Sequence, residues 1–193
     1  MSTLRKPGRV TVAEFQLWHT ESDGERWHLI DGEPVLMAPA SEDHGRIQAE
    51  AAFLIGAHLR ERRPGCDVII APGVVPHVRS AMNERIADIA VSCTPSSGGR
   101  TITAPVLLVE ILSPSNEAIT RANVWAYTTI PSVQEVLLLA SVEIGAELLR
   151  RGADERWPAD PVMIRDGDDI EFSSIGFRAP LRAFYRTTSL LRR

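Results

Sequence analysis

Apolar residues recur along the chain with two different periods, and the change of period marks the order of the predicted elements. After Ser41 they follow helical spacing until the chain reaches Pro64-Gly65, so we expect a helix over residues 41–63. A shorter helix is expected over residues 11–20, beginning at Thr11. Between the two, apolar runs on either side of Asp31-Gly32 predict a β-hairpin over residues 27–37.

Four apolar runs in the middle of the chain predict the strands of one sheet. They cover residues 67–78, 85–93, 106–112 and 133–140, and the first is interrupted at Pro72-Gly73. The third is unbroken, as is typical of a strand buried on both faces. A helix over residues 117–129 separates the last two runs, and weaker patterns predict outer strands at 146–151 and 169–173 and a helical turn at 180–185. This order predicts an α/β fold with a mixed central sheet flanked by helices, preceded by an N-terminal helix and hairpin.

Composition supports one globular domain over residues 1–193, with residues 1–10 flexible. Of the residues 44% are hydrophobic, and no apolar run approaches the length of about 18 residues that a membrane span needs. Cys66 and Cys93 do not suggest a disulfide framework, so we expect a cytoplasmic protein. The net charge of −4 excludes a protein that simply coats DNA, and any nucleic-acid contact must be local.

Two carboxylates interrupt core strands and are the candidate chemical groups. Asp88 lies within an otherwise apolar strand, and Glu110 follows the run that ends at Val109. Burying such groups is costly unless they are paired or bind a cation, and oxygen ligands on adjacent strands suit magnesium. The alternative is structural: each carboxylate points to solvent at a strand end or caps a nearby loop.

Several short segments, in this order and spacing, resemble the Uma-type family of putative restriction endonucleases. The matching segments are residues 29–33 (LIDGE), residues 38–41 (APAS) with His44 and Ile47, residues 86–91 (IADIAV), residues 109–115 (VEILSPS), and Tyr127 with residues 130–135 (IPSVQE). The resemblance covers about residues 11–140. It implies the restriction-endonuclease-like core fold, DNA as the partner, and Mg²⁺ or Mn²⁺ held by Asp88 and Glu110.

The sequence departs from the resemblance at the position of the catalytic lysine. Two residues after Glu110 stands Leu112, and the alternative position four residues before Tyr127 is Asn123. Lys6, in the N-terminal segment, is the only lysine among the 21 lysine and arginine residues. A lysine would position the attacking water and offset negative charge, whereas Asn123 only forms hydrogen bonds. His28 also stands where the family tends to have a glutamate.

Three functions remain open from the sequence. The first is a metal-dependent DNA endonuclease, and the second is a nuclease-like fold that has lost cutting and serves as a binding or assembly module. The third is a hydrolase of some other phosphate ester at the same site. The absence of the catalytic lysine and the net negative charge of the chain favour the second function, the binding or assembly module.

The endonuclease hypothesis makes specific predictions about geometry. Asp88 and Glu110 should converge at the edge of a concave surface and share a cation with the carbonyl of Ile111. Asn123 and Tyr127 should lie above the two carboxylates on one face of the helix. His28 should approach from the hairpin. It could be a general base or a metal ligand, or simply a hairpin side chain in contact with a tryptophan. Because cutting both strands commonly uses two-fold pairing, we also expect a homodimer, which a monomer mass in light scattering would refute.

Overall fold

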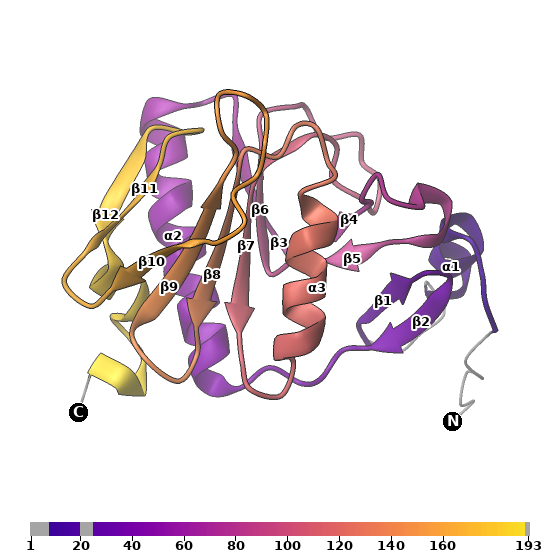
Figure 1. The fold of residues 1–193 in the computed structure, drawn as a ribbon, viewed down its shortest axis with the longest axis horizontal. Coiled ribbons are helices and arrows are strands. Elements are labelled where there is room, and N and C mark those ends of the chain that lie inside the picture. The colour runs from indigo at the N-terminus through magenta and orange to yellow at the C-terminus, as the bar shows by residue number, and fades with distance from the viewer. Residues whose placement is uncertain (1–7, 20–24, 192–193) are drawn as a thin grey trace.

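The computed structural model describes residues 8–19 and 25–191 as a sheet between helices (Figure 1). The helices are α1 (Val12–His19), α2 (Glu42–Arg62) and α3 (Glu117–Tyr127). The central sheet has the spatial order β10 (Val162–Arg165), β9 (Gly145–Arg150), β8 (Glu135–Ala140), β7 (Pro105–Leu112), β6 (Ile89–Ser92) and β3 (Asp67–Ile70). Strands β7 and β8 are parallel and the other neighbours are antiparallel, so the sheet is mixed as predicted.

Smaller elements surround this sheet at both ends. Two-stranded pairs are formed by β1 (Trp27–Ile30) with β2 (Glu33–Leu36), β4 (Gly73–Val74) with β5 (Arg85–Ile86), and β11 (Asp169–Phe172) with β12 (Phe177–Pro180). Short 3₁₀ helices cover Ser80–Met82, Leu181–Tyr185 and Ser189–Leu191. Figure 1 places α1 and β1–β2 beside β4–β5 at one end of the molecule, and β11–β12 beyond the opposite edge of the sheet.

The alternation of side chains along β7 explains why both faces of the sheet are covered. Leu107, Val109 and Ile111 pack with apolar residues of α2 in one cluster. Leu108 belongs to a second cluster on the other face, which contains Val124 and Tyr127 of α3. Because a strand's side chains alternate between its faces, Glu110 lies on the face that α3 covers.

The predicted hairpin forms, and it is joined to the segment before β5. Asp31 has φ 48° and Gly32 has φ 81°, the two positive values that a type I′ turn requires. The backbone of Leu29 exchanges two hydrogen bonds with Glu84, of 2.7 and 3.0 Å. This pairing brings His28 of β1 next to Arg85 of β5.

The four predicted strands all contribute to the central sheet, but two of them divide. Residues 67–78 become β3 and β4, and residues 85–93 become β5 and β6, with β4 and β5 outside the sheet. The physical reason lies at Ala71, whose φ of 50° turns the chain just before Pro72. Strands β10 and β12 were not predicted from the sequence, because each is only four residues long and largely exposed.

Cys66 and Cys93 form a disulfide bond, which their number and spacing in the sequence did not suggest. They are 27 residues apart in the sequence. The antiparallel register of β3 and β6 sets Asp67 opposite Ser92, and the next facing pair is Cys66 and Cys93. Sequence spacing alone does not reveal this pairing, because it depends on which strands become neighbours.

The expected flexibility of residues 1–10 falls mainly on residues 1–7, which lie outside the described part of the chain, as does Lys6. Val10 is described, and its amide donates a 2.8 Å hydrogen bond to the carbonyl of Gly32. Within the described residues, none of the helices combines the length and the apolar character needed to cross a bilayer.

Candidate functional site

Asp88 and Glu110 meet at one end of the central sheet. Strands β6 and β7 are antiparallel with Ile89 opposite Val109, so the next pair in register is Asp88 opposite Glu110. Asp88 stands just before β6 begins, and Glu110 lies near the carboxyl end of β7. Both residues are buried, with relative exposures of 9% and 5%. The sequence-based expectation that the two carboxylates converge agrees with this register.

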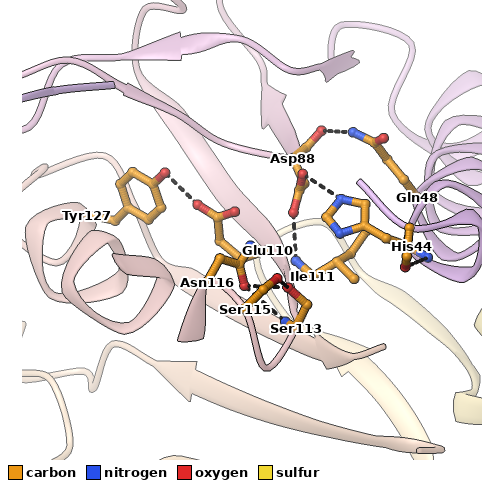
Figure 2. A network of polar contacts seen from close by, with 10 residues as sticks. His44, Gln48, Asp88, Glu110, Ile111, Ser113, Ser115, Asn116 and Tyr127 are labelled. Carbon is orange, nitrogen blue, oxygen red and sulfur yellow. Dashed lines mark hydrogen bonds and ion pairs between the residues drawn. The ribbon is translucent and has the colours of Figure 1, made fainter. Parts of the chain in front are cut away.

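Asp88 is held by contacts from both neighbouring elements (Figure 2). Its Oδ1 lies 3.0 Å from Nε2 of His44, and its Oδ2 accepts a 2.7 Å hydrogen bond from the amide of Ile111. Its backbone carbonyl accepts hydrogen bonds from Gln48 Nε2 at 2.7 Å and from the amide of Ala71 at 3.0 Å. His44 and Gln48 lie one turn apart on α2, so one face of this helix positions Asp88.

Glu110 is held from the opposite side by Tyr127 of α3. The Tyr127 hydroxyl donates a 2.6 Å hydrogen bond to Oε1 of Glu110 (Figure 2). Burial, and then the negative charge of Asp88, raise the pKa of the Glu110 carboxyl well above its usual range, and the Tyr127 hydrogen bond opposes this shift only in part. Two carboxylates thus share one poorly solvated site, which a cation would stabilise.

Asn123 supplies an oxygen atom that has no partner. It lies one turn before Tyr127 on the same face of α3 and is 2% exposed, and its Oδ1 is buried without a hydrogen bond. Carboxylate and amide oxygens are the ligands that Mg²⁺ and Mn²⁺ prefer. The residues present therefore fit a divalent cation, although the described residues hold no group of three histidine, cysteine or acidic side chains arranged for a metal.

His28 approaches this cluster from the hairpin as expected, but its hydrogen bond defines its chemistry. The amide of Ile86 donates to Nδ1 of His28 at 3.1 Å, and a backbone amide can only donate. The neutral ring therefore carries its proton on Nε2 and presents a donor rather than a base or a metal ligand. Burial first, and then the charge of Arg85, lower the pKa of His28 to about 4, against the opposing effect of Asp88.

This shift predicts that His28 makes the fold sensitive to acid. The folded-state pKa of His28, about 4, lies below the unfolded value of 6.5. Between these limits the unfolded chain binds more protons than the folded chain, so stability is lost as the pH is lowered from 6.5 towards 4. His28→Asn keeps an acceptor for the Ile86 amide and removes the titration. From pH 7 to pH 4.5, urea unfolding should show a loss of stability that is about 2 kcal/mol smaller in this variant. Parallel losses in both proteins would contradict the prediction.

Sequence reasoning did not identify three residues that the fold brings to the site. His44 was singled out only as part of the resemblance, and its Nε2 lies 3.0 Å from Oδ1 of Asp88. Gln48 and Arg85 were not singled out. The sequence shows that His44 and Gln48 lie one turn apart on the same face of a helix. It does not show which strand that face packs against. Arg121 of α3, by contrast, pairs with Glu117 and Glu147 rather than with the site carboxylates.

Two surface hollows begin just beyond the carboxyl end of β7. They have volumes of about 460 and 720 Å³, and Ser113 and Pro114 line both. Asp88 and Glu110 line neither of them. The larger hollow also contains Ser41, the N-cap of α2, together with Arg46 and Ser115. Its wall, which is rich in hydroxyl groups, includes Ser113, three residues after Glu110 in the chain.

A family comparison gives this geometry a context. The family model described as Uma2, putative restriction endonuclease, matches residues 12–179. The matched range contains both carboxylates, the hairpin, α2 and α3.

Individual proteins resemble the chain over nearly its whole length. Two proteins of Synechocystis sp., the uncharacterized proteins slr1290 and sll1609, are 28% and 26% identical to it. These alignments cover 92% and 85% of this chain, and 92% and 93% of the relatives. The crystal structure of a putative nuclease belonging to DUF820, from Anabaena variabilis, superposes with a TM-score of 0.71. At 15% identity, over 92% of this chain and 98% of the other, this likeness shows a shared fold.

Proposed function

Because this chain belongs to the Uma2 family of putative restriction endonucleases, we propose that it is a metal-dependent endonuclease that hydrolyses phosphodiester bonds in DNA. The observation that carries the proposal is the buried pair of Asp88, directly before β6, and Glu110 opposite it on the neighbouring strand β7. A burial this costly is rarely retained for stability alone, and strongly shifted carboxyl groups cluster at functional sites.

Asp88 and Glu110 would hold Mg²⁺ or Mn²⁺, with the carbonyl of Ile111 as a further ligand. When bound, the cation polarises the phosphate and lowers the pKa of an attacking water. The protein's own groups fix this pair in place. His44 and the Ile111 amide orient the carboxylate of Asp88, while the Tyr127 hydroxyl orients that of Glu110.

The remaining polar groups act on the water and the phosphate. Asn123 offers its unpartnered Oδ1 as an acceptor for a water proton or as a cation ligand. His28, with its proton on Nε2, offers a donor to a phosphate oxygen without adding charge. Neither residue replaces the positive charge of a lysine, so we expect slow cleavage. Cutting both DNA strands would need two such sites, and the homodimer that would supply them stays a prediction.

The test of this proposal is manganese-dependent nicking of supercoiled plasmid. Glu110→Gln should reduce the rate by at least about a hundredfold, because the neutral amide is a much weaker cation ligand. The matched control is Glu50→Gln, a buried carboxylate on α2 that pairs with Arg186 away from the site. It should retain the wild-type rate. Equal rates in wild type and Glu110→Gln would contradict the proposal.

Adding a positive charge at the position of the missing lysine should accelerate cleavage. Asn123→Lys places an ammonium one turn from Tyr127, where it offsets the charge that develops on the phosphate, and we expect roughly a tenfold increase in rate. Asn123→Met, of comparable length and without charge, is the control and should give no increase. A gain in both variants would indicate that removal of Asn123, rather than charge, is responsible.

A binding or assembly module is the second candidate function, and the presence of buried Asn123 in place of lysine favours it. This alternative predicts that neither wild type nor Asn123→Lys cuts DNA with Mn²⁺ present. Retained binding of a labelled DNA duplex in the absence of any cutting would then establish it.

A further inference from the structure

Arg85 is a buried cation at the centre of the elements that form the site. It lies on β5 and is 6% exposed. One terminal nitrogen, Nη1, donates a hydrogen bond to the carbonyl of Leu29 in the hairpin. Its Nε is buried without any hydrogen-bond partner. A buried N–H without a partner destabilises a fold, so its retention calls for an explanation.

The charge of Arg85 is also uncompensated at close range. Among the ion pairs of the described residues, which extend to 4.0 Å, none includes Arg85. Asp31 acts on it only from a longer distance, and that carboxylate is already paired with Arg79 at 3.2 Å. Buried charges are normally paired, because an unpaired one has lost its hydration without gaining a partner. The guanidinium is therefore placed to receive an anion.

The position of Arg85 indicates where that anion would lie. Arg85 precedes Asp88 by three residues, and its charge lowers the pKa of His28 and opposes the rise in the pKa of the Tyr127 hydroxyl. Tyr127 in turn donates to Glu110. The guanidinium thus shares one electrostatic environment with the hairpin histidine, the tyrosine of α3 and the carboxylate pair.

We propose that Arg85 is a catalytic residue whose guanidinium contacts the scissile phosphate and supplies the positive charge that Asn123 lacks. The inference rests on the proposed endonuclease function. An arginine suits this role because its charge persists at all accessible pH values and its planar donors match phosphate oxygens. The competing explanation is structural, since Arg85 also ties β5 to the hairpin through the Leu29 carbonyl.

Metal affinity separates these explanations, because a nearby fixed charge and a bound cation repel each other. Arg85→Met should bind Mn²⁺ about three- to tenfold more tightly than wild type in calorimetric titration without DNA. An arginine whose charge is too far from the carboxylate pair to act on it would leave this affinity unchanged. Arg85→Lys keeps the charge and should bind Mn²⁺ as wild type does. Arg178→Met removes an exposed arginine of β12 that pairs with Asp169, and it controls for the loss of net charge.

DNA binding supplies a second measurement that does not depend on cutting. With EDTA present, the affinity of a fluorescein-labelled duplex for Arg85→Met should fall, and the slope of log K against log salt should decrease by about one phosphate contact. Arg178→Met should retain the wild-type slope. In the nicking assay with Mn²⁺, Arg85→Met should lose about a hundredfold in rate, and Arg85→Lys should retain a larger part of it.

The outcomes distinguish this inference from the function on which it rests. Tighter Mn²⁺ binding with a reduced salt slope and slow cutting supports a phosphate contact. Wild-type cutting with unchanged Mn²⁺ affinity and salt slope in folded Arg85→Met overturns the role of Arg85 and leaves the endonuclease intact. If Arg85→Met fails to fold, Arg85→Lys decides, because a structural arginine with no phosphate contact predicts wild-type DNA affinity and rate. A wild type that neither binds Mn²⁺ nor cuts overturns both proposals.

Discussion

Glu110→Gln is expected to raise the melting temperature of the metal-free protein. Burial and the adjacent charge of Asp88 both destabilise an ionised Glu110, and the glutamine amide removes that charge while keeping an acceptor for the Tyr127 hydroxyl. We expect a gain of about 1–2 kcal/mol, or roughly 2–8 °C for a chain of this length. Differential scanning calorimetry with EDTA present measures it.

The same variant should lose the response to metal. Mn²⁺ should raise the melting temperature of wild type, because a ligand that binds only the folded chain stabilises it, and should leave that of Glu110→Gln almost unchanged. A melting temperature for Glu110→Gln that falls below that of metal-free wild type would indicate a structural carboxylate instead.

Glu135→Ala is expected to have the opposite effect on stability, although Glu135 is as deeply buried. It lies on β8, the strand parallel to β7, and is 1% exposed. Its carboxylate accepts from Arg150 Nε at 2.7 Å, from the amides of Ser173 and Ser174 at 3.1 and 3.0 Å, and from the Ser174 hydroxyl at 2.5 Å. Removing this buried carboxylate, the acceptor of several charge-assisted hydrogen bonds, costs about 1.5–3 kcal/mol, which lowers the melting temperature by roughly 3–12 °C.

Asp169→Ala provides the comparison for this loss. Its carboxylate pairs with Arg178 on the surface, where an ion pair contributes at most about 1 kcal/mol. Calorimetry should therefore show a small change for this variant and a large one for Glu135→Ala. Similar losses in both would mean that the four donors around Glu135 do not stabilise the fold as argued.

These two glutamates show what the sequence alone can and cannot predict. Glu110 interrupts an apolar strand and Glu135 begins one. A carboxylate beside apolar residues is therefore not enough to tell a candidate metal ligand from a structural ion-pair partner. The difference lies in their partners, which come from distant segments. Glu135 meets Ser173 and Ser174 from the turn after β11, whereas Glu110 meets Asp88 and Tyr127.

Local chemistry predicted the elements better than it predicted their partners. The Asp31-Gly32 turn, the Ser41 cap of α2 and the buried run of β7 follow from neighbouring residues, and all of them form. The roles of His44 and Arg85 depend on which helix face meets β6 and on how the hairpin pairs with Glu84, and neither is encoded locally. The disulfide bond between Cys66 and Cys93 was not predicted from the sequence for the same reason.

The most direct test of the proposed metal site is a calorimetric titration of Mn²⁺ into wild type, Asp88→Ala and Glu50→Gln. If Asp88 and Glu110 share one cation, wild type and Glu50→Gln should each bind about one equivalent with the same affinity, and Asp88→Ala should bind at least about a hundredfold more weakly. Equal affinity in Asp88→Ala and wild type, or no binding to wild type at all, would contradict a metal site built on these two carboxylates.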